Sequence, residues 1–405
     1  MVANRLAPTG DEAVDAISGL VRDWGLKEVR PRFRELEEKG EFPRDLYRQM
    51  GQLGFFGCCF PETMGGTDSG FRALAAVSEQ LAWVYPPLSA CMNLQAATVP
   101  LTIANWGTEE QVERYVGGLL SGELLGANGM TEPDGGSDFL GAMRTRAVRD
   151  GDDYVINGAK MWITNANVAD VVVIYAKTDP SAAHRGVTAF LVPTSTPGFE
   201  VRRVPCRVLG SLMPTNAITL DDVRVPASSV LGGEGKGFVV AMTAMDFGRL
   251  TVASRSVGLA QACLDAALTY ADQREAFGEK IGSFQLIKKQ IADMSAEVAA
   301  ARGLVAAAAL RYDAGDIATR ESSLAKYYAG EVCNRAAQAT AEIFGGSAFS
   351  DEFPISTYLN YAKLWQTGEG SANIQALLIA DDALGWKDMD RHKTVLRLAG
   401  AGARP

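Results

Sequence analysis

Several residue types and patterns that would point to common functions are scarce or missing in this sequence. Only two histidines occur in 405 residues, His184 in a polar loop and His392 in a hydrophilic tail, and this argues against histidine acid–base catalysis. The six cysteines show neither a C-x-x-C pair nor zinc-ligand spacing, so we expect free thiols in a reducing compartment and no metal site. A catalytic acid or base must therefore come from another residue type.

Clustered positive charge and long hydrophobic runs are also missing. The formal net charge is −9, and no run of Lys and Arg offers a surface to nucleic acid or to an anionic membrane. No stretch approaches the roughly 18 consecutive apolar residues of a membrane span, and the N-terminal segment lacks the apolar core of a signal peptide. We expect a cytoplasmic protein without a nucleic-acid partner or a membrane span.

The spacing of apolar residues changes twice along the chain, and together with the chain length this predicts about two or three domains. Apolar residues recur at helical spacing in residues 1–125 and again in residues 236–405, where long alanine-rich helices end in a charged tail from residue 387. Residues 126–235 instead carry short β-rich runs between Gly, Pro and Asp turns. We expect a mainly α fold with a central β-domain whose strands include residues 153–157, 171–176, 187–192 and 217–220.

The most informative residue is Glu369, a carboxylate between two glycines at the start of an apolar-periodic helix. Glycine neighbours allow a substrate to approach closely, and a glutamate can serve as a general base. We therefore predict Glu369 as the catalytic base. The alternative is a solvated acid that the dipole of the following helix favours at its N-terminus.

Three further segments could hold a cofactor. The loop Gly129–Asp138 combines Thr131, Ser137 and adjacent glycines, whose free N–H groups suit a phosphate or a ring oxygen, although such a loop can also be a plain turn. In Asn157–Asn165, alternation places Trp162 and Thr164 on one face, as a wall for a planar ring or as ordinary core.

The third segment lies between two helical patterns. Arg274 and Phe277 precede Gly278, and Gln285 opens the next helix. Arginine binds phosphate oxygens bidentately and Phe277 could cover an adenine, whereas the alternative is an ordinary helix connection with Gly278 as its stop signal. No segment matches G-x-G-x-x-G or G-x-x-x-x-G-K-[ST], so neither a Rossmann site nor a P-loop is supported.

Together and in this order, the segments resemble the acyl-CoA dehydrogenase family over nearly the whole chain, from residue 61 to residue 373. One such motif would be a weak signal, whereas five in register make chance agreement implausible. The five motifs are TEPDGGSD (131–138), MWIT (161–164), REAFG (274–278), IFGG (343–346) and EGS (369–371).

The resemblance implies an N-terminal helical domain, a middle β-barrel-like domain and a C-terminal four-helix bundle, with FAD bound between the subunits of a homotetramer. It implies α,β-dehydrogenation of an acyl thioester, with Glu369 as the α-proton base, flavin N5 as hydride acceptor and an electron-transfer flavoprotein as partner. The residues implied at the flavin end are Met130, Thr131, Gly136, Ser137, Trp162, Ile163 and Thr164, with Ser371 and Asn373 after the base. Those implied at the adenosine end of a neighbouring subunit's FAD are Arg274, Phe277, Gln285, Glu342, Gly345 and Gly346. Those implied at the thioester are Ser137, Asp246, Arg249, Gly368 and Gly370.

Some positions depart from the family pattern or bear on the substrate. Some relatives keep their catalytic glutamate at the position of Gly248, so a single base at Glu369 is consistent here. Gly368 replaces a common aromatic residue, which favours an alicyclic or branched acyl group, and Glu342 replaces a usual glutamine. The segment Trp83–Met92, near the expected acyl pocket, contains no Arg or Lys, which disfavours a dicarboxylic acyl group.

Alternatives remain open at this stage. An acyl-thioester oxidase or a flavin monooxygenase of the same superfamily would use oxygen, and Glu369 argues against the monooxygenase but not against the oxidase. A helical interaction module without enzymatic activity would contain no flavin. The sequence also leaves open whether the acyl group arrives on CoA or on a carrier protein.

Overall fold

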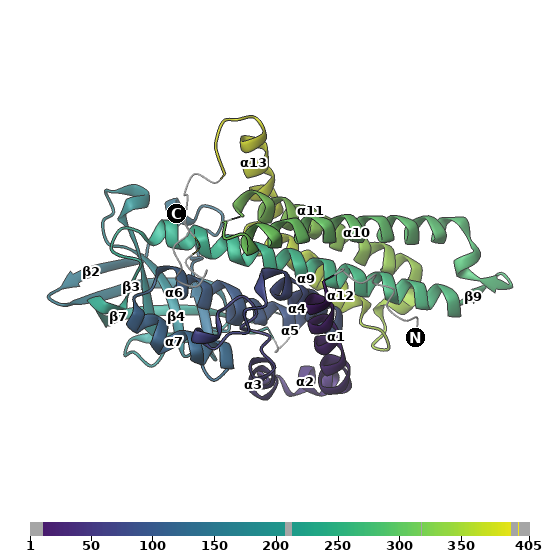
Figure 1. Ribbon diagram of the computed structural model, residues 1–405, viewed down its shortest axis with the longest axis horizontal. Helices are drawn as coiled ribbons and strands as arrows, with labels where there is room; N and C mark the ends of the chain where they lie inside the picture. The colour runs from purple at the N-terminus through teal and green to yellow at the C-terminus, as the bar shows by residue number, and fades with distance from the viewer. Residues whose placement is uncertain (1–10, 207–212, 317, 390–395, 397–405) are drawn as a thin grey trace.

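The computed structural model describes residues 11–206, 213–316, 318–389 and 396, with the side chains of residues 37 and 39 left out. His392 and most of the charged tail predicted after residue 387 lie outside the described residues. The described part forms a β-sheet at one end and a set of long helices that extend away from it (Figure 1). Among the described residues, no helix is both long and apolar enough to cross a membrane.

The N-terminal part is helical, as predicted. Two of its helix starts are fixed by side-chain hydrogen bonds: Asp11 accepts from the N–H groups of Ala13 and Val14, and Thr108 and Gln111 form a reciprocal capping box. The helices are α1 (Glu12–Trp24), α2 (Phe33–Lys39), α3 (Arg44–Gln52), α4 (Gly70–Val84), α5 (Pro86–Asn93), α6 (Pro100–Trp106) and α7 (Glu109–Ser121).

The middle part contains an eight-stranded sheet in the order β6-β7-β3-β2-β4-β5-β8, with β1 paired in parallel to β4. The predicted strands are confirmed, and several of them are longer than predicted. Their bounds are β1 (Gly126–Gly129), β2 (Arg146–Asp150), β3 (Asp153–Thr164), β4 (Val171–Lys177), β5 (Val187–Pro193), β6 (Phe199–Arg203), β7 (Thr215–Pro226) and β8 (Val230–Leu231), with the short helix α8 (Phe139–Ala142) after β1.

The C-terminal part is dominated by α9 (Gly237–Gln273), whose 37 residues give a length of about 55 Å at 1.5 Å per residue. It starts against β5, where a Cβ on Gly237 would lie 2.6 Å from the carbonyl carbon of Thr188, so the close approach requires glycine. It ends at the hairpin β9 (Glu275–Ala276) and β10 (Glu279–Lys280), far from the sheet (Figure 1). The remaining helices are α10 (Gln285–Asp313), α11 (Thr319–Phe344), α12 (Ile355–Thr367) and α13 (Ala372–Ala383).

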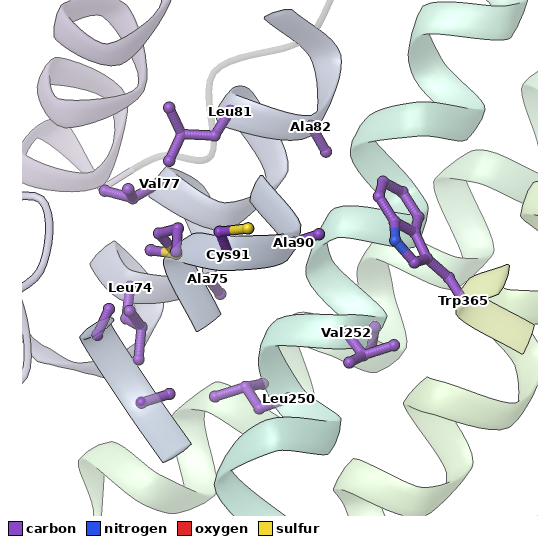
Figure 2. Close-up of a cluster of buried hydrophobic side chains, with 14 of the residues drawn as sticks. Leu74, Ala75, Val77, Leu81, Ala82, Ala90, Cys91, Leu250, Val252 and Trp365 are labelled. Carbon is purple, nitrogen blue, oxygen red and sulfur yellow. The ribbon is translucent and has the colours of Figure 1, made fainter. Parts of the chain in front are cut away.

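The main hydrophobic core joins the N-terminal and C-terminal helices, and a smaller core lies within the sheet. Figure 2 shows part of the main core, where Leu74 and Val77 of α4, Cys91 of α5 and Val252 of α9 meet, with the Trp365 indole of α12 lying against α9. All six cysteines are free thiols, as predicted, and five of them are buried. This packing fixes α5, α9 and α12 relative to one another.

Candidate active site

Glu369 lies in the short loop between α12 and α13, and its backbone is in the left-handed region with φ +55°. This conformation is uncommon for a residue with a Cβ, and it persists only where the surroundings hold it. Lys326 of α11 does so, because its ammonium group donates to the carbonyl oxygens of Gln366, at 3.2 Å, and of Gly370. The loop is therefore tied down on both sides of Glu369.

The two carboxylate oxygens of Glu369 have different surroundings. Oε1 accepts a hydrogen bond of 3.0 Å from Nδ2 of Asn93, the last residue of α5. Oε2 is buried and has no hydrogen-bond donor among the described residues. It lies against α9 at Gly248, where a built Cβ would be 2.7 Å from Oε2. One oxygen is thus held and the other is free to accept a proton.

Charge and burial act on this carboxylate in opposite directions. Burial raises the pKa of Glu369, and this is the largest effect, while the nearby cations of Arg255, Lys326 and Arg249 lower it, in that order, together with the hydrogen bond from Asn93. The net direction is upward. A glutamate with a raised pKa is a stronger base when ionised, and three cations help to keep it ionised.

The cations are themselves buried. Arg255 is 5% exposed, stacks over the Trp365 ring at 5.2 Å, and burial lowers its pKa to about 10. Burial, together with the charges of Arg249 and Arg255, lowers the pKa of Lys326 to about 7. Arg249 instead forms an ion pair with Asp246 at 2.7 Å, one helical turn away. Asp246 and Arg249, predicted to line the thioester channel, therefore lie on the same buried stretch of α9 as Gly248.

The glycine loop and the Trp162 strand are joined by a buried ion pair. Lys160 of β3 contacts Glu132 at 2.7 Å, and both side chains are almost fully buried. Lys160 also donates to the carbonyl oxygen of Tyr175 on β4 at 2.7 Å, and the N–H of Met161 donates to the oxygen of Thr131 at 2.9 Å. These bonds fix Thr131 beside β3.

Tyr175 connects this loop to the base. Its phenol is buried, and burial followed by the negative charge of Glu369 raises its pKa. β4 thus presents its backbone to Lys160 and its phenol to the neighbourhood of Glu369. β4, which is bonded to Lys160, is therefore the element that links the Thr131 loop to the surroundings of Glu369.

Simple alternation predicted a regular strand through Trp162, but the strand is irregular at this residue. The pairing with β7 shifts between Lys160 and Ile163, so that Met161 and Trp162 oppose a single residue, and Trp162 has φ +63°. This bulge leaves the indole 54% exposed, with Thr164 half-buried two residues later. Ile163, also predicted at the cofactor, packs its side chain into the core of the sheet.

The remaining predicted flavin-end residues are less enclosed. Met130 and Thr131 are half-buried, whereas Gly136 and Ser137 are exposed. Ser371 accepts from the N–H of Ile374 as the N-cap of α13, which begins directly after the base loop. Asn373 is exposed on the first turn of α13, and Gly368 and Gly370 flank Glu369.

The predicted adenosine-end residues form a second group at the far end of α9. Phe277 and Gly278 both have positive φ in the tight β9–β10 hairpin, and the Phe277 side chain is 97% exposed. Glu342 accepts from Nε2 of Gln290 at 2.6 Å, and a built Cβ at Gly345 or Gly346 meets no atom within 4 Å. The residues in this group are Arg274, Phe277, Gln285, Glu342, Gly345 and Gly346, all exposed.

Sequence reasoning missed four residues around the base: Asn93, Thr251, Arg255 and Lys326. They come from three helices, and Asn93 is 276 positions away from Glu369. The one available signal was a polar residue inside an apolar helical stretch, as in Cys91-Met-Asn-Leu94 and Val252-Ala-Ser-Arg255. A polar side chain in such a stretch indicates a buried hydrogen-bonding role.

Comparison with known proteins identifies the family. Family models for the N-terminal, middle and C-terminal domains of acyl-CoA dehydrogenase match residues 11–123, 127–223 and 235–384. A probable acyl-CoA dehydrogenase of Bacillus subtilis (strain 168) is 39% identical over 368 residues, which cover 90% of this chain and 96% of the relative. The glutaryl-CoA dehydrogenase of Desulfococcus multivorans is 39% identical over 377 residues, covering 92% and 96%.

Solved structures agree with this. The butyryl-CoA dehydrogenase of Megasphaera elsdenii superimposes with a TM-score of 0.89 at 32% identity, covering 94% of this chain and 100% of that one. A glutaryl-coenzyme A dehydrogenase in complex with glutaryl-CoA gives a TM-score of 0.91 at 36% identity, covering 94% and 98%. The chain therefore belongs to the acyl-CoA dehydrogenase family of FAD-dependent oxidoreductases that act on CH–CH bonds.

Proposed function

We propose that this protein converts an acyl thioester to the trans-2-enoyl thioester, with Glu369 as the base that removes the α-proton. The observation that carries this proposal is the carboxylate itself, with Oε1 held by Asn93 and Oε2 buried, free of donors and close to three cations. A solvated acid at a helix N-terminus, the alternative reading, would have water around both oxygens. The buried Oε2 does not fit that alternative.

The residues on the sheet side fit the isoalloxazine ring of FAD. The bulge leaves a large planar indole exposed at Trp162, with Thr164 two residues further along the strand and the loop after β1 bonded to the same strand through the Thr131 oxygen. Met130, Thr131, Gly136, Ser137, Trp162 and Thr164 would hold the ring, with Ile163 contributing its backbone. When bound, FAD supplies the acceptor for the hydride that leaves the β-carbon.

About 55 Å of α9 lies between the far-end group and the sheet. This separation supports a cofactor that is shared between two chains. We therefore propose that Arg274 and Phe277, with the four other residues of this group, hold the diphosphate and adenosine of a neighbouring subunit's FAD. This arrangement requires an oligomer, and we propose a homotetramer.

Glu369 suits the abstraction of a weakly acidic α-proton. Burial raises its pKa towards that of a carbon acid, which improves the match between base and substrate. The negative charge that develops on the thioester carbonyl oxygen needs preorganised donors, and the N–H of Glu369 is the donor that we propose. Because this N–H and the carboxylate belong to one residue, the loop that fixes one also fixes the other.

Two candidate functions, a dehydrogenase and an oxidase, differ in the electron acceptor that they use. We favour an electron-transfer flavoprotein, since a relative 38% identical to this chain is a subunit of a caffeyl-CoA reductase–Etf complex of Acetobacterium woodii. The second candidate is an oxidase that uses oxygen, and a structure named as a prolyl acyl carrier protein oxidase superimposes with a TM-score of 0.88 at 25% identity. That name also supports a carrier protein as an alternative to CoA.

Two features of the site bear on the identity of the acyl group: the residue next to the base and the charge near the segment Trp83–Met92. Gly368 leaves space next to the base, which supports an alicyclic or branched acyl group. A dicarboxylic acyl group is less disfavoured than the sequence predicts, because Arg255 of α9 donates to the oxygen of Ala90 at 3.3 Å and so brings a cation to the segment Trp83–Met92, which itself contains none. Both classes belong in a substrate panel.

A panel of thioesters tests the function directly. Butyryl, cyclohexanecarbonyl and glutaryl groups, each on CoA and on a carrier protein, are mixed with the yellow protein without oxygen. We expect at least one to bleach the flavin and to yield the enoyl thioester. Rapid reoxidation in air would assign the oxidase, and slow reoxidation the flavoprotein acceptor. No bleaching by any thioester, or a purified protein without flavin, would refute the proposal.

A further inference from the structure

Asn93 makes the one hydrogen bond to the Glu369 carboxylate that the described residues provide. Its Nδ2 donates to Oε1 at 3.0 Å, while its Oδ1 accepts from the hydroxyl of Thr251 on α9. Asn93 is 2% exposed and Thr251 is fully buried, so the bond between these two side chains is shielded from water. Three elements that are distant in sequence, α5, α9 and the base loop, thus meet in a single line of hydrogen bonds.

The Thr251 hydroxyl and the Glu369 carboxylate, which can only accept, together favour one orientation of the Asn93 amide. An amide can present either its oxygen or its NH₂ group to a neighbour, and the hydrogen-bond network decides between them. Because the Thr251 hydroxyl donates to Oδ1, the NH₂ group is turned towards Glu369. A flipped amide would place its oxygen against a carboxylate oxygen, and two acceptors repel each other.

We propose that Asn93 and Thr251 form a positioning relay for the base: Thr251 orients the Asn93 amide, and the amide holds Oε1 of Glu369 so that Oε2 alone faces the substrate's α-carbon. The inference rests on the proposed role of Glu369. Neither residue is a ligand of the cofactor or a proton acceptor in the reaction. Their contribution is the direction in which the free oxygen of the base is aimed.

A neutral amide suits this role better than a cation would. It favours the ionised form of Glu369 through one hydrogen bond, without adding a full positive charge that would weaken the base. The charged and titratable groups around Glu369 are Arg249 and Arg255 of α9, Lys326 of α11 and Tyr175 of β4. The three cations act on Glu369 through charge and the Tyr175 phenol is neutral, so Asn93 is the group that adds direction.

The relay predicts a specific pattern in four variants. Asn93→Ala should lower kcat on the order of 10- to 100-fold with little change in KM, as for the loss of a hydrogen bond to a charged group. It should also move the acidic limb of the pH profile to higher pH, because losing the donor raises the pKa of Glu369.

Thr251→Val should act in the same direction to a smaller extent. Thr251→Ser keeps the hydroxyl, so its kcat should fall less than that of Thr251→Val. Ser254→Ala removes a buried hydroxyl of α9 that bonds to the Leu250 oxygen, and it should leave the pH profile in place.

Coupling separates a relay from two independent effects. The double variant Asn93→Ala/Thr251→Val should lose no more rate than Asn93→Ala alone, because Thr251 acts only through Asn93. The Thr251 hydroxyl is also 3.0 Å from the Gly248 oxygen, so Asn93→Ala does not leave it without an acceptor. Losses that multiply in the double variant would overturn the relay.

Two further readouts make the test independent of turnover and of folding. Flavin absorbance and Tm are measured for each variant, and the part of the pH dependence of Tm that disappears in Glu369→Gln reports the pKa of Glu369 without any substrate. If Asn93→Ala fails to fold, the Thr251→Val and Thr251→Ser pair carries the test. An unshifted acidic limb in Asn93→Ala or Thr251→Val, with an active parent and an inactive Glu369→Gln, refutes the relay alone. An inactive parent refutes the proposed function instead.

Discussion

The surroundings of Glu369 and the far end of α9 are built in opposite ways. Around Glu369 the chain supplies its own partners, with buried side chains, an amide on one carboxylate oxygen and cations from two helices. At the far end Phe277 is 97% exposed, and the Arg274 guanidinium has no ion-pair partner in the described part of the chain. The first region obtains its partners from within the chain. The second has exposed side chains, which supports our proposal that it binds part of a neighbouring subunit's cofactor.

This contrast separates two kinds of contribution to one reaction. If the residues near Glu369 control proton transfer, as we propose, substituting them should change rates while the protein stays yellow. If the far-end residues hold the cofactor, substituting them should change flavin content while the loaded protein keeps its rate. Four experiments can break or sharpen this division.

The largest effect is expected from Glu369→Gln. The amide keeps the shape of the side chain but cannot take a proton, so dehydrogenation should fall by about 10²- to 10⁴-fold, the usual contribution of a general base. Flavin content should stay at the parent level. The rate is measured with an artificial electron acceptor and the flavin by its absorbance. An undiminished rate would mean that the base is elsewhere.

Arg274→Gln is the converse experiment. Loss of a charge-assisted contact to a diphosphate should weaken FAD binding on the order of 10- to 100-fold, and excess FAD should restore the rate. FAD affinity is measured by fluorescence titration of the stripped protein. Arg224→Gln serves as the control, because this exposed arginine pairs with Asp150 and Asp153 on the sheet. Equal effects of the two substitutions would contradict the assignment of the far end.

Arg255→Met should change the pH dependence rather than the rate at high pH. Arg255 is the cation that lowers the pKa of Glu369 most, so its loss should raise that pKa further. The acidic limb of kcat/KM should move to higher pH, with a loss of roughly tenfold at low pH for each unit of movement. Arg255→Lys keeps the charge and should keep most of the limb's position. A limb that stays in place in Arg255→Met would show that the charge does not reach the base.

The smallest effect is a gain of stability in Glu369→Gln. A buried carboxyl with a raised pKa favours its neutral form in the folded state, and that contribution is lost as the pH rises through the folded pKa. At pH 8 the parent therefore carries a cost that glutamine lacks, and Tm should rise by about 1–2 °C. The difference should shrink as the pH falls towards 4.5, the ordinary pKa of glutamate. A lower Tm at pH 8 would show that the neighbouring cations outweigh burial.

Much of this architecture could be predicted from the sequence. The strands at residues 171–176 and 187–192 were apolar runs between turn residues, and the structure confirms them as β4 and β5. Glu369, Trp162 and Arg274 stand in motifs that are contiguous in sequence, so a local pattern was enough to select them. Their proposed roles await the experiments above.

The local geometry at these residues was not predictable from the same patterns. Trp162, Phe277 and Glu369 all have positive φ, which intrinsic preferences disfavour and which only tertiary contacts impose. For Trp162 the cause is a bulge set by pairing with β7, and for Glu369 it is the clamp by Lys326. Asn93, Thr251 and Arg255 were missed because they belong to no motif and meet Glu369 only through helix packing.

The glycine at position 248 has a consequence for the place of the base. Even a single added carbon there would lie 2.7 Å from Oε2 of Glu369, so a larger residue would push the carboxyl group out of its present position. The aim of the base is therefore set in part by a side chain that α9 does not have.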